Sequence, residues 1–179
     1  MEIKQDSRSY IRFYFDGELR TLNNVRTSDM VMRWLRSEAM RTGTKEGCNE
    51  GDCGACTCIV GHLNEFGVIQ FKLINTCIFP LSYLDGGWLI SVETLSRSGS
   101  LSSVQREMLP LNLSQCGFCT PGMIMSAKHL LDNNPKPNEE EIRCGISGNL
   151  CRCTGYQNIV KSVQYASNKL EVSQTEGVE

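Results

Sequence analysis

The sequence predicts an α+β fold in two consecutive parts, residues 1–93 and 94–170. In the first part, apolar and polar residues alternate with the period of two that is typical of half-buried strands, and one helical stretch lies between them. In the second part, the apolar residues recur at helical spacing instead. Ten cysteines in 179 residues form one main group in each part, so we expect each part to be built around its own thiols.

Strands are expected in the first part wherever apolar residues recur at every second position. Asp16-Gly17 is a strong signal for the tight turn of a hairpin. Thr27 or Ser28 can cap a helix that Gly43 follows, and this helix should pack on the small sheet. The strands are expected over residues 11–15, 19–22, 59–60, 69–73 and 88–92.

Four short helices are expected in the second part, which is enough for a compact bundle. Their starts carry residues that satisfy or complement the free N–H groups of a first helical turn. After them, residues 171–179 offer little to bury, so we expect a disordered tail there. The expected starts are near Val104, at Thr120-Pro121, at Asn138 before three glutamates, and at a capping box of Thr154 and Gln157.

The cysteine group of the first part lies in a glycine-rich stretch. Cys48, Cys53 and Cys56 follow each other in the order C-x4-C-x2-C, the spacing of plant-type [2Fe–2S] ferredoxins. A thiolate cage around two irons requires a tightly turning backbone, and the interleaved glycines permit positive φ. Such a loop also aims backbone N–H groups at the sulfurs, which stabilises an anionic cluster. We expect Cys77, beyond the strand over 69–73, to be the fourth ligand.

The cysteine group of the second part consists of two pairs, Cys116 with Cys119 and Cys151 with Cys153. Each pair stands directly before an expected helix start. The partial positive charge and free N–H groups of helix N-termini suit an anionic iron–sulfur cluster. Four cysteines in this arrangement are also typical of structural zinc. The helical part is therefore expected to hold a second cluster, with zinc as the open alternative.

The overall composition narrows the classes of function. A net charge of −2 leaves no basic surface for nucleic acid, and no apolar run approaches the ~18 residues of a membrane span. The polar start of the chain, without an apolar signal segment, favours the reducing cytoplasm, where clustered cysteines indicate metal rather than disulfides. Cys58, Cys144, His62 and His129 lie outside the two groups and are expected to be structural.

Four segments, which carry both cysteine groups and their flanking residues, together resemble one family. The chain is similar to the iron–sulfur subunits of the molybdenum hydroxylases, the xanthine dehydrogenase and aldehyde oxidoreductase family. The long gap between Cys56 and Cys77 fits the xanthine dehydrogenase branch. The resemblance implies a β-grasp ferredoxin-like domain over 1–93 and a four-helix-bundle [2Fe–2S] domain over 94–170. The segments are residues 42–48, 50–57, 114–122 and 148–156.

The resemblance also implies cofactors and partners. A large partner subunit would hold the catalytic molybdopterin and another subunit FAD, in a heterotrimer or its dimer. The second cluster would lie beside the pterin, with Gln115 and Cys153 as contacts, and the first cluster nearer the flavin. This chain would relay electrons and hold no catalytic residue. The implied ligands are Cys48, Cys53, Cys56 and Cys77 for the first cluster, and Cys116, Cys119, Cys151 and Cys153 for the second.

The substrate stays open at this point, because the chain itself offers no residue for binding it. A xanthine dehydrogenase is the first expectation, and the same relay role in an aldehyde, carbon monoxide or other N-heterocycle dehydrogenase is the alternative. A zinc-stapled interaction module is the alternative from another class. Many bacterial xanthine dehydrogenase chains continue into a flavin domain, whereas this sequence ends at Glu179. We therefore expect a third subunit with FAD, or another electron acceptor.

Overall fold

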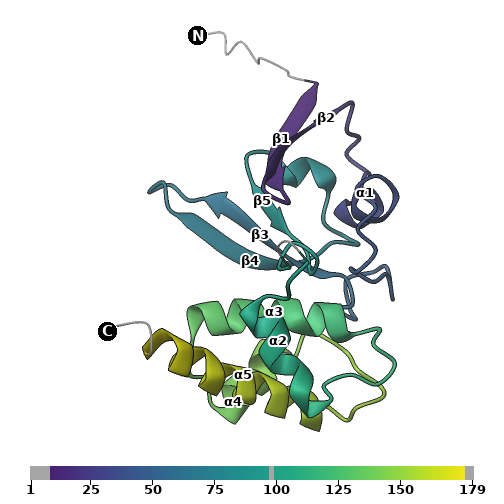
Figure 1. The fold of residues 1–179 in the computed structure, drawn as a ribbon. Coiled ribbons are helices and arrows are strands. Elements are labelled where there is room, and N and C mark those ends of the chain that lie inside the picture. Colours follow the sequence, from purple (N-terminus) through teal and green to yellow (C-terminus); the bar gives the residue numbers. More distant parts are fainter. Residues whose placement is uncertain (1–8, 97–98, 176–179) are drawn as a thin grey trace.

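The computed structural model describes residues 9–96 and 99–175 and shows the expected α+β architecture (Figure 1). A mixed sheet with one packed helix forms the first half, and a group of helices forms the second. A 3-10 turn, η1 (Leu81–Leu84), precedes the last strand and was not expected. The elements of the first half are β1 (Tyr10–Phe15), β2 (Glu18–Asn23), α1 (Val31–Ser37), β3 (Thr57–Leu63), β4 (Ile69–Asn75) and β5 (Trp88–Ile90).

The five strands follow the order β2-β1-β5-β3-β4 across the sheet. β1 runs parallel to β5, and the other neighbouring strands are antiparallel. The β1–β2 hairpin turns at Asp16 and Gly17, whose φ angles are 53° and 81°. Two consecutive positive φ values are the geometry of a type I′ turn, so the hairpin predicted from these two residues is confirmed.

Helix α1 packs on one face of the sheet. The ring of Trp34 meets those of Phe13 and Phe15 edge-on, with centroid distances of 5.1 and 5.2 Å. The expected cap at Thr27 or Ser28 is wrong, because the N-cap position is Met30 and no side chain caps the helix. The first N–H groups of α1 are instead satisfied by backbone carbonyls of residues 76–79, so a distant loop determines where the helix begins.

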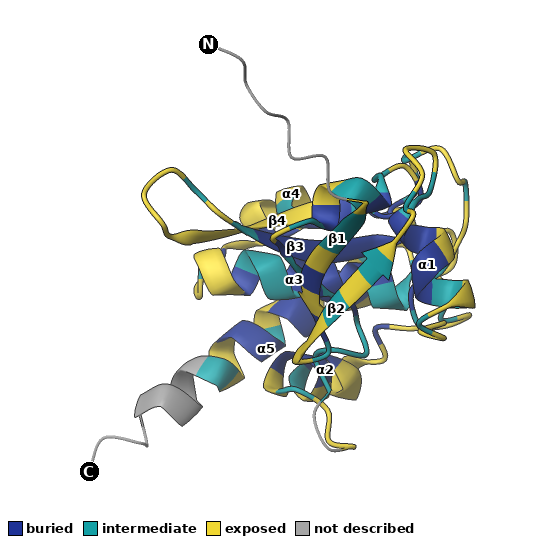
Figure 2. Cartoon of the chain, turned by 90° about the horizontal axis from the view of Figure 1, so that it is seen from above, coloured by how far each residue is buried: buried dark blue, intermediate teal, exposed yellow. Residues whose placement is uncertain are grey.

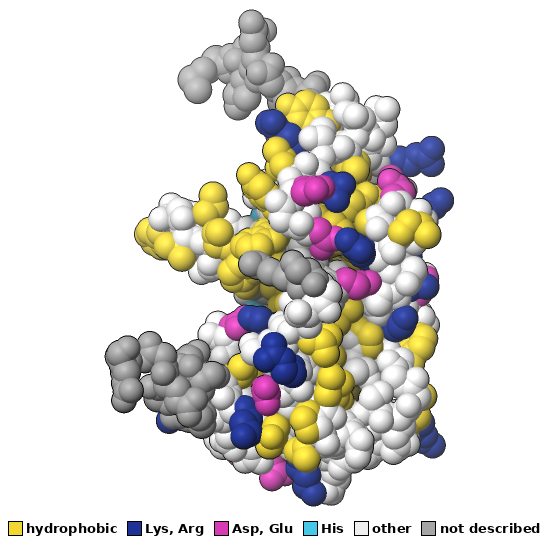
Figure 3. All heavy atoms as spheres, viewed as in Figure 1, with side chains coloured by type: hydrophobic (Ala, Val, Ile, Leu, Met, Phe, Trp, Pro, Cys, Tyr) yellow, Lys and Arg dark blue, Asp and Glu magenta, His cyan; other side chains and the backbone are white. Residues whose placement is uncertain are grey.

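The β3–β4 hairpin presents apolar side chains on the face that points away from α1. Leu63, Ile69 and Phe71 are 64%, 47% and 40% exposed, and Phe66 at the tip is 79% exposed. Figure 1 shows this hairpin projecting from the body, and Figure 3 shows its apolar surface beside a hollow above the helical half. In an antiparallel sheet the apolar face is usually buried and the polar face solvated. In this hairpin the apolar face is exposed as well.

The second half consists of helices that enclose a core of its own. α3 lies against β3 and β4 (Figure 1), and Figure 2 shows buried residues along α3 and α5. Met108, Met123, Ile142, Ile159 and Val163 belong to this core. None of the described helices is long and apolar enough to cross a membrane. The helices are α2 (Ser103–Met108), η2 (Leu109–Leu111), α3 (Thr120–Asn133), α4 (Glu139–Gly145) and α5 (Gln157–Thr175).

The helix starts agree in part with the sequence signals. Asn138 and Glu141 form a reciprocal capping box at α4. The capping box expected of Thr154 and Gln157 is not formed, because the Thr154 hydroxyl lies 3.1 Å from the Cys151 sulfur and accepts a hydrogen bond from the Tyr156 backbone N–H at 3.2 Å. Helix α5 continues five residues beyond residue 170, where the sequence predicted its end. Residues 176–179 of the predicted tail lie outside the described residues.

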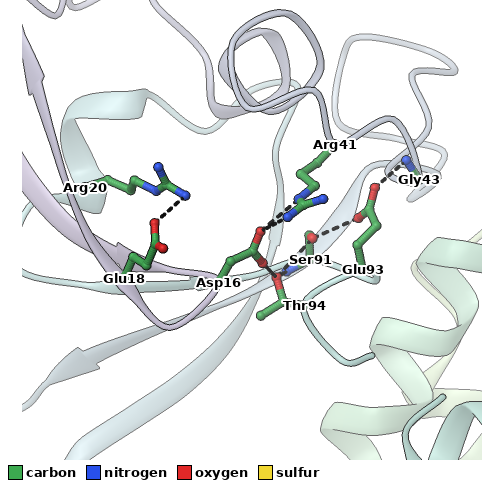
Figure 4. Close-up of polar contacts among 8 residues, drawn as sticks. All are labelled: Asp16, Glu18, Arg20, Arg41, Gly43, Ser91, Glu93 and Thr94. Carbon is green, nitrogen blue, oxygen red and sulfur yellow. Dashed lines mark hydrogen bonds and ion pairs between the residues drawn. The ribbon is translucent and has the colours of Figure 1, made fainter. Parts of the chain in front are cut away.

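The segment between the two halves is tied to the sheet half by a polar network (Figure 4). The Asp16 carboxylate accepts hydrogen bonds from Arg41 Nε at 2.8 Å and from the Thr94 hydroxyl at 2.7 Å. The Glu93 carboxylate accepts one from the Gly43 backbone N–H at 2.6 Å. A Cβ atom at Gly43 would lie 2.6 Å from the same carboxylate oxygen, so a larger residue there would have to displace the Glu93 side chain. The network thereby fixes the backbone just before the first cysteine group.

Two candidate thiol-lined metal centres

The first cysteine group comes together from two loops. Cys48, Cys53 and Cys56 lie between α1 and β3, and Cys77 follows β4. The sulfurs of Cys56 and Cys77 are 3.3 Å apart. The backbone N–H of Cys48 lies 3.4 Å from the sulfur of Cys53, and the backbone N–H of Cys53 lies 3.4 Å from the sulfur of Cys48. The four sulfurs predicted as ligands therefore stand as two close pairs.

Backbone N–H groups surround the sulfur of Cys48. Those of Glu50, Asp52 and Cys53 lie 3.5, 3.3 and 3.4 Å from it. The loop can wrap the sulfur because Asn49 and Gly51 have positive φ values of 59° and 87°. The N–H of Glu50, followed by that of Cys53, lowers the pKa of the Cys48 thiol to about 6. The loop thus stabilises a thiolate, the form that binds metal.

In the metal-free chain, Cys48 is expected to react with iodoacetamide near neutral pH, because a thiol with a pKa of about 6 is mainly thiolate there. Its labelling should fall as the pH drops through about 6, when the thiolate takes up a proton. Cys58 is the internal control, since burial raises the pKa of its thiol to about 12. Peptide mass spectrometry over a pH series checks this, and equal labelling of both residues near neutral pH would contradict it.

The second cysteine group also forms two pairs. The sulfurs of Cys116 and Cys153 are 3.5 Å apart, and Cys151 is near enough to Cys119 to affect the pKa of its thiol. Cys119 is the N-cap residue of α3, and Cys151 lies shortly before α5. Burial, followed by the neighbouring Cys151, raises the pKa of the Cys119 thiol to about 12. The two loops thus bring together all four cysteines that the sequence placed in this group.

The paired arrangement fits a [2Fe–2S] group better than a single ion. In such a cluster each of two irons takes two protein ligands, and each cysteine group offers two pairs of sulfurs. A structural zinc site would gather four sulfurs around one centre. The donor set of both groups is therefore of the type that a two-iron cluster requires.

The two thiol loops touch each other directly. The backbone N–H of Leu150 donates to the carbonyl oxygen of Cys53 at 2.9 Å. Leu150 is directly followed by Cys151. Cys53 of the first group is therefore connected to Cys151 of the second group through this hydrogen bond and the single residue Leu150. Sequence analysis did not anticipate this contact, because its two sides are almost a hundred residues apart in the chain.

The other residues singled out in the sequence lie as follows. Gln115 and Cys153 are both exposed. They lie near each other, because the sulfur of Cys116, the residue after Gln115, is 3.5 Å from that of Cys153. Cys58 is fully buried in β3, with its sulfur 3.6 Å from the Thr44 hydroxyl, as a structural residue would be. Cys144 is exposed on α4. The structure thus leaves Cys58 and Cys144 outside the two predicted groups of four.

Comparisons with known proteins agree with this picture. The family of [2Fe-2S] binding domains matches residues 91–164. The xanthine dehydrogenase of Emericella nidulans is 40% identical over 165 residues, which are 92% of this chain and 12% of that protein. The nicotinate dehydrogenase small FeS subunit of Eubacterium barkeri is 41% identical and is covered over 93% of its length, with 87% of this chain. Quinoline 2-oxidoreductase from Pseudomonas putida 86 superposes with a TM-score of 0.79 at 31% identity, covering 91% of this chain and 96% of that one.

The fold and the paired thiols together define an iron–sulfur protein of the [2Fe–2S] class. The chain belongs to the iron–sulfur subunits and domains of the molybdenum hydroxylase family. It spans about an eighth of the length of the xanthine dehydrogenases it matches, and nearly the whole of the separate small subunit from Eubacterium barkeri.

Proposed function

We propose that the chain is the electron-transfer subunit of a molybdenum hydroxylase and that it holds two [2Fe–2S] clusters. The observation that carries this proposal is the pairing of sulfurs in two groups whose loops are in hydrogen-bond contact. The first cluster is held by Cys48, Cys53, Cys56 and Cys77, and the second by Cys116, Cys119, Cys151 and Cys153. When bound, these clusters supply one-electron acceptors, and the chain itself holds, shields and orients them.

The proposed order of the relay is the one that the resemblance to the family implies, and the exposure of the second group supports it. Cys116 and Cys153 are exposed, whereas Cys56 and Cys77 are buried. We place the molybdopterin of a large partner subunit beside the exposed end of the second group, with Gln115 and Cys153 in contact with it. Electrons then pass to the first group and on to FAD in a further subunit. Both transfers move electrons alone, so this chain requires no general acid or base.

The architecture and assembly follow the same proposal. The sheet half, up to residue 93, is a β-grasp ferredoxin-like domain, and residues 94–170 are a four-helix-bundle domain. The partners make a heterotrimer or its dimer. The apolar side chains of the β3–β4 hairpin are exposed in the isolated chain, which supports a contact with a partner subunit. The proposed compartment is the reducing cytoplasm, where free thiols persist, and the ten free thiols of the chain support this proposal.

The proposed substrate is a purine, as in a xanthine dehydrogenase. The relative named xanthine dehydrogenase is 40% identical over 92% of the chain. Two relatives that match the chain as whole subunits are named for nicotinate and quinoline, which are also N-heterocycles. Another N-heterocycle is therefore the second candidate, and an aldehyde or carbon monoxide the third. The substrate is bound by the large subunit, so its identity has to be measured on the complex.

Anaerobic addition of hypoxanthine or xanthine to the purified complex is expected to bleach the visible absorbance of both clusters. The physical reason is that two electrons released at molybdenum must leave through this chain one at a time. Dithionite serves as the control, because it reduces both clusters whatever the substrate. Bleaching by dithionite but not by purine would keep the relay and contradict the purine substrate, and parallel trials with nicotinate, quinoline and an aldehyde would then identify the class.

A further inference from the structure

The side chain of Asn149 is buried between the two cysteine groups, with 2% of its surface exposed. Its amide Nδ2 donates to the carbonyl oxygen of Gly54 at 2.8 Å and to the hydroxyl of Thr57 at 3.0 Å. Its Oδ1 accepts a hydrogen bond from the Ser126 hydroxyl at 2.6 Å. One amide thus joins the first thiol loop, helix α3 and the loop that leads into the second thiol group.

Three backbone segments close around this amide without room for side chains. A Cβ atom at Gly54 would lie 2.2 Å from the carbonyl oxygen of Gly148 and 2.6 Å from Asn149 Nδ2. A Cβ atom at Gly122, in the first turn of α3, would lie 2.2 Å from the carbonyl oxygen of Gly54. Two glycines therefore make room for the bridge that Asn149 forms.

The bridge lies next to the direct contact between the two groups. Leu150, the residue after Asn149, donates its backbone N–H to the Cys53 carbonyl at 2.9 Å. Because Asn149 fixes Gly54 and Leu150 fixes Cys53, two adjacent residues of one loop hold two adjacent residues of the other. Without the Asn149 bridge, the contact at Cys53 would depend on the hydrogen bond from the Leu150 N–H.

We propose that Asn149 is a positioning residue that holds the two thiol loops at the separation required for fast electron transfer between them. The proposal rests on the proposed relay function. In the step it governs, one electron leaves the second site and arrives at the first, and no bond, proton or leaving group changes place. Electron transfer slows steeply as the gap between donor and acceptor widens, so a loosened bridge should slow the transfer while both sites remain filled.

The test replaces Asn149 by leucine in the complete complex, since leucine has a similar size and forms none of the three hydrogen bonds. Iron and acid-labile sulfide should stay at the wild-type level. The magnetic coupling between the two reduced centres, measured by electron paramagnetic resonance, should weaken. Reduction of the first centre by substrate should slow by about tenfold or more, the scale on which residues supporting metal ligands act.

Two further variants separate this role from a general loss of packing. Ser126→Ala removes the bond to Oδ1 and leaves both bonds to the first loop, so coupling and rate should stay near wild type. Asn149→Asp keeps the size and the Ser126 bond but loses the donors to Gly54 and Thr57, so it should behave as Asn149→Leu does. Wild-type coupling and rate in the leucine and aspartate variants would overturn the proposal.

A measurement on the unmodified complex covers the case in which these variants do not assemble. The backbone N–H of Leu150 should exchange with deuterium slowly, at the rate of core amides, because the bridge holds it against Cys53. Exchange at the rate of an exposed loop amide would overturn the proposal. A wild-type complex that contains iron and sulfide for fewer than two clusters would contradict the relay function itself, which is a different failure.

Discussion

Replacing Cys116 by serine is expected to remove the second cluster and to stop electron flow through the chain. Cys116 forms one of the two close pairs of its group, with its sulfur 3.5 Å from that of Cys153. Iron–sulfur clusters prefer soft thiolate ligands, and a serine hydroxyl is a hard oxygen donor that is a poor substitute. Iron and sulfide should fall by half, and turnover by more than about 100-fold, because loss of a direct ligand exceeds the effect of its supporting residues. Metal analysis and paramagnetic resonance of the reduced complex check this.

Cys144→Ser is the matched control for this substitution. Cys144 is exposed on α4 and belongs to neither group. Its replacement should leave both cluster signals and the turnover unchanged. Retention of two full cluster signals in Cys116→Ser would contradict the assignment of the second group.

Replacing Gly54 by alanine is expected to separate the two halves where the first thiol loop contacts residues 148–150. Gly54 has a φ of +67°, and a Cβ atom there would lie 2.2 Å from the Gly148 carbonyl oxygen. A backbone atom cannot move aside as a flexible side chain can, so the two loops must part. We expect a loss of about 4 kcal/mol or more in the free energy of unfolding, at the severe end for single substitutions. Urea denaturation of the chain measures it.

Gly67→Ala is the control that isolates the cost of the backbone conformation. Gly67 has a φ of +75° at the tip of the β3–β4 hairpin, and nothing lies within 4 Å of the position of its Cβ. It should therefore cost only about 1–2 kcal/mol, the strain of a left-handed conformation. A similar loss in both variants would show that the contact of Gly54 with the second loop contributes nothing.

Much of the fold could be predicted because its signals are local. Asp16 and Gly17 form the turn that their identities indicate, and Asn138 and Glu141 form the predicted capping box. The cysteine spacing and the strand over 69–73 were enough to place Cys77 beside the loop that carries Cys56. In each case the residues that decide the geometry lie close together in the sequence or repeat with a fixed period.

The features that sequence analysis missed depend on distant residues. Helix α1 starts at Val31 because carbonyls of residues 76–79 receive its first N–H groups. The Thr154 hydroxyl is drawn to the Cys151 sulfur instead of capping α5. Asn149 bonds to Gly54 across 95 residues, and nothing in the spacing of either motif indicates that pairing. Contacts of this kind follow from how the two halves pack and not from a local pattern.

The central claim is that this chain holds two [2Fe–2S] clusters, and analysis of the purified complex for iron, zinc and acid-labile sulfide tests it most directly. Two iron and two sulfide ions are required for each cluster, so twice that content per chain is expected, with two distinct paramagnetic signals after reduction. Zinc in place of iron, without sulfide, would contradict the claim and would assign the paired thiols to structural metal sites.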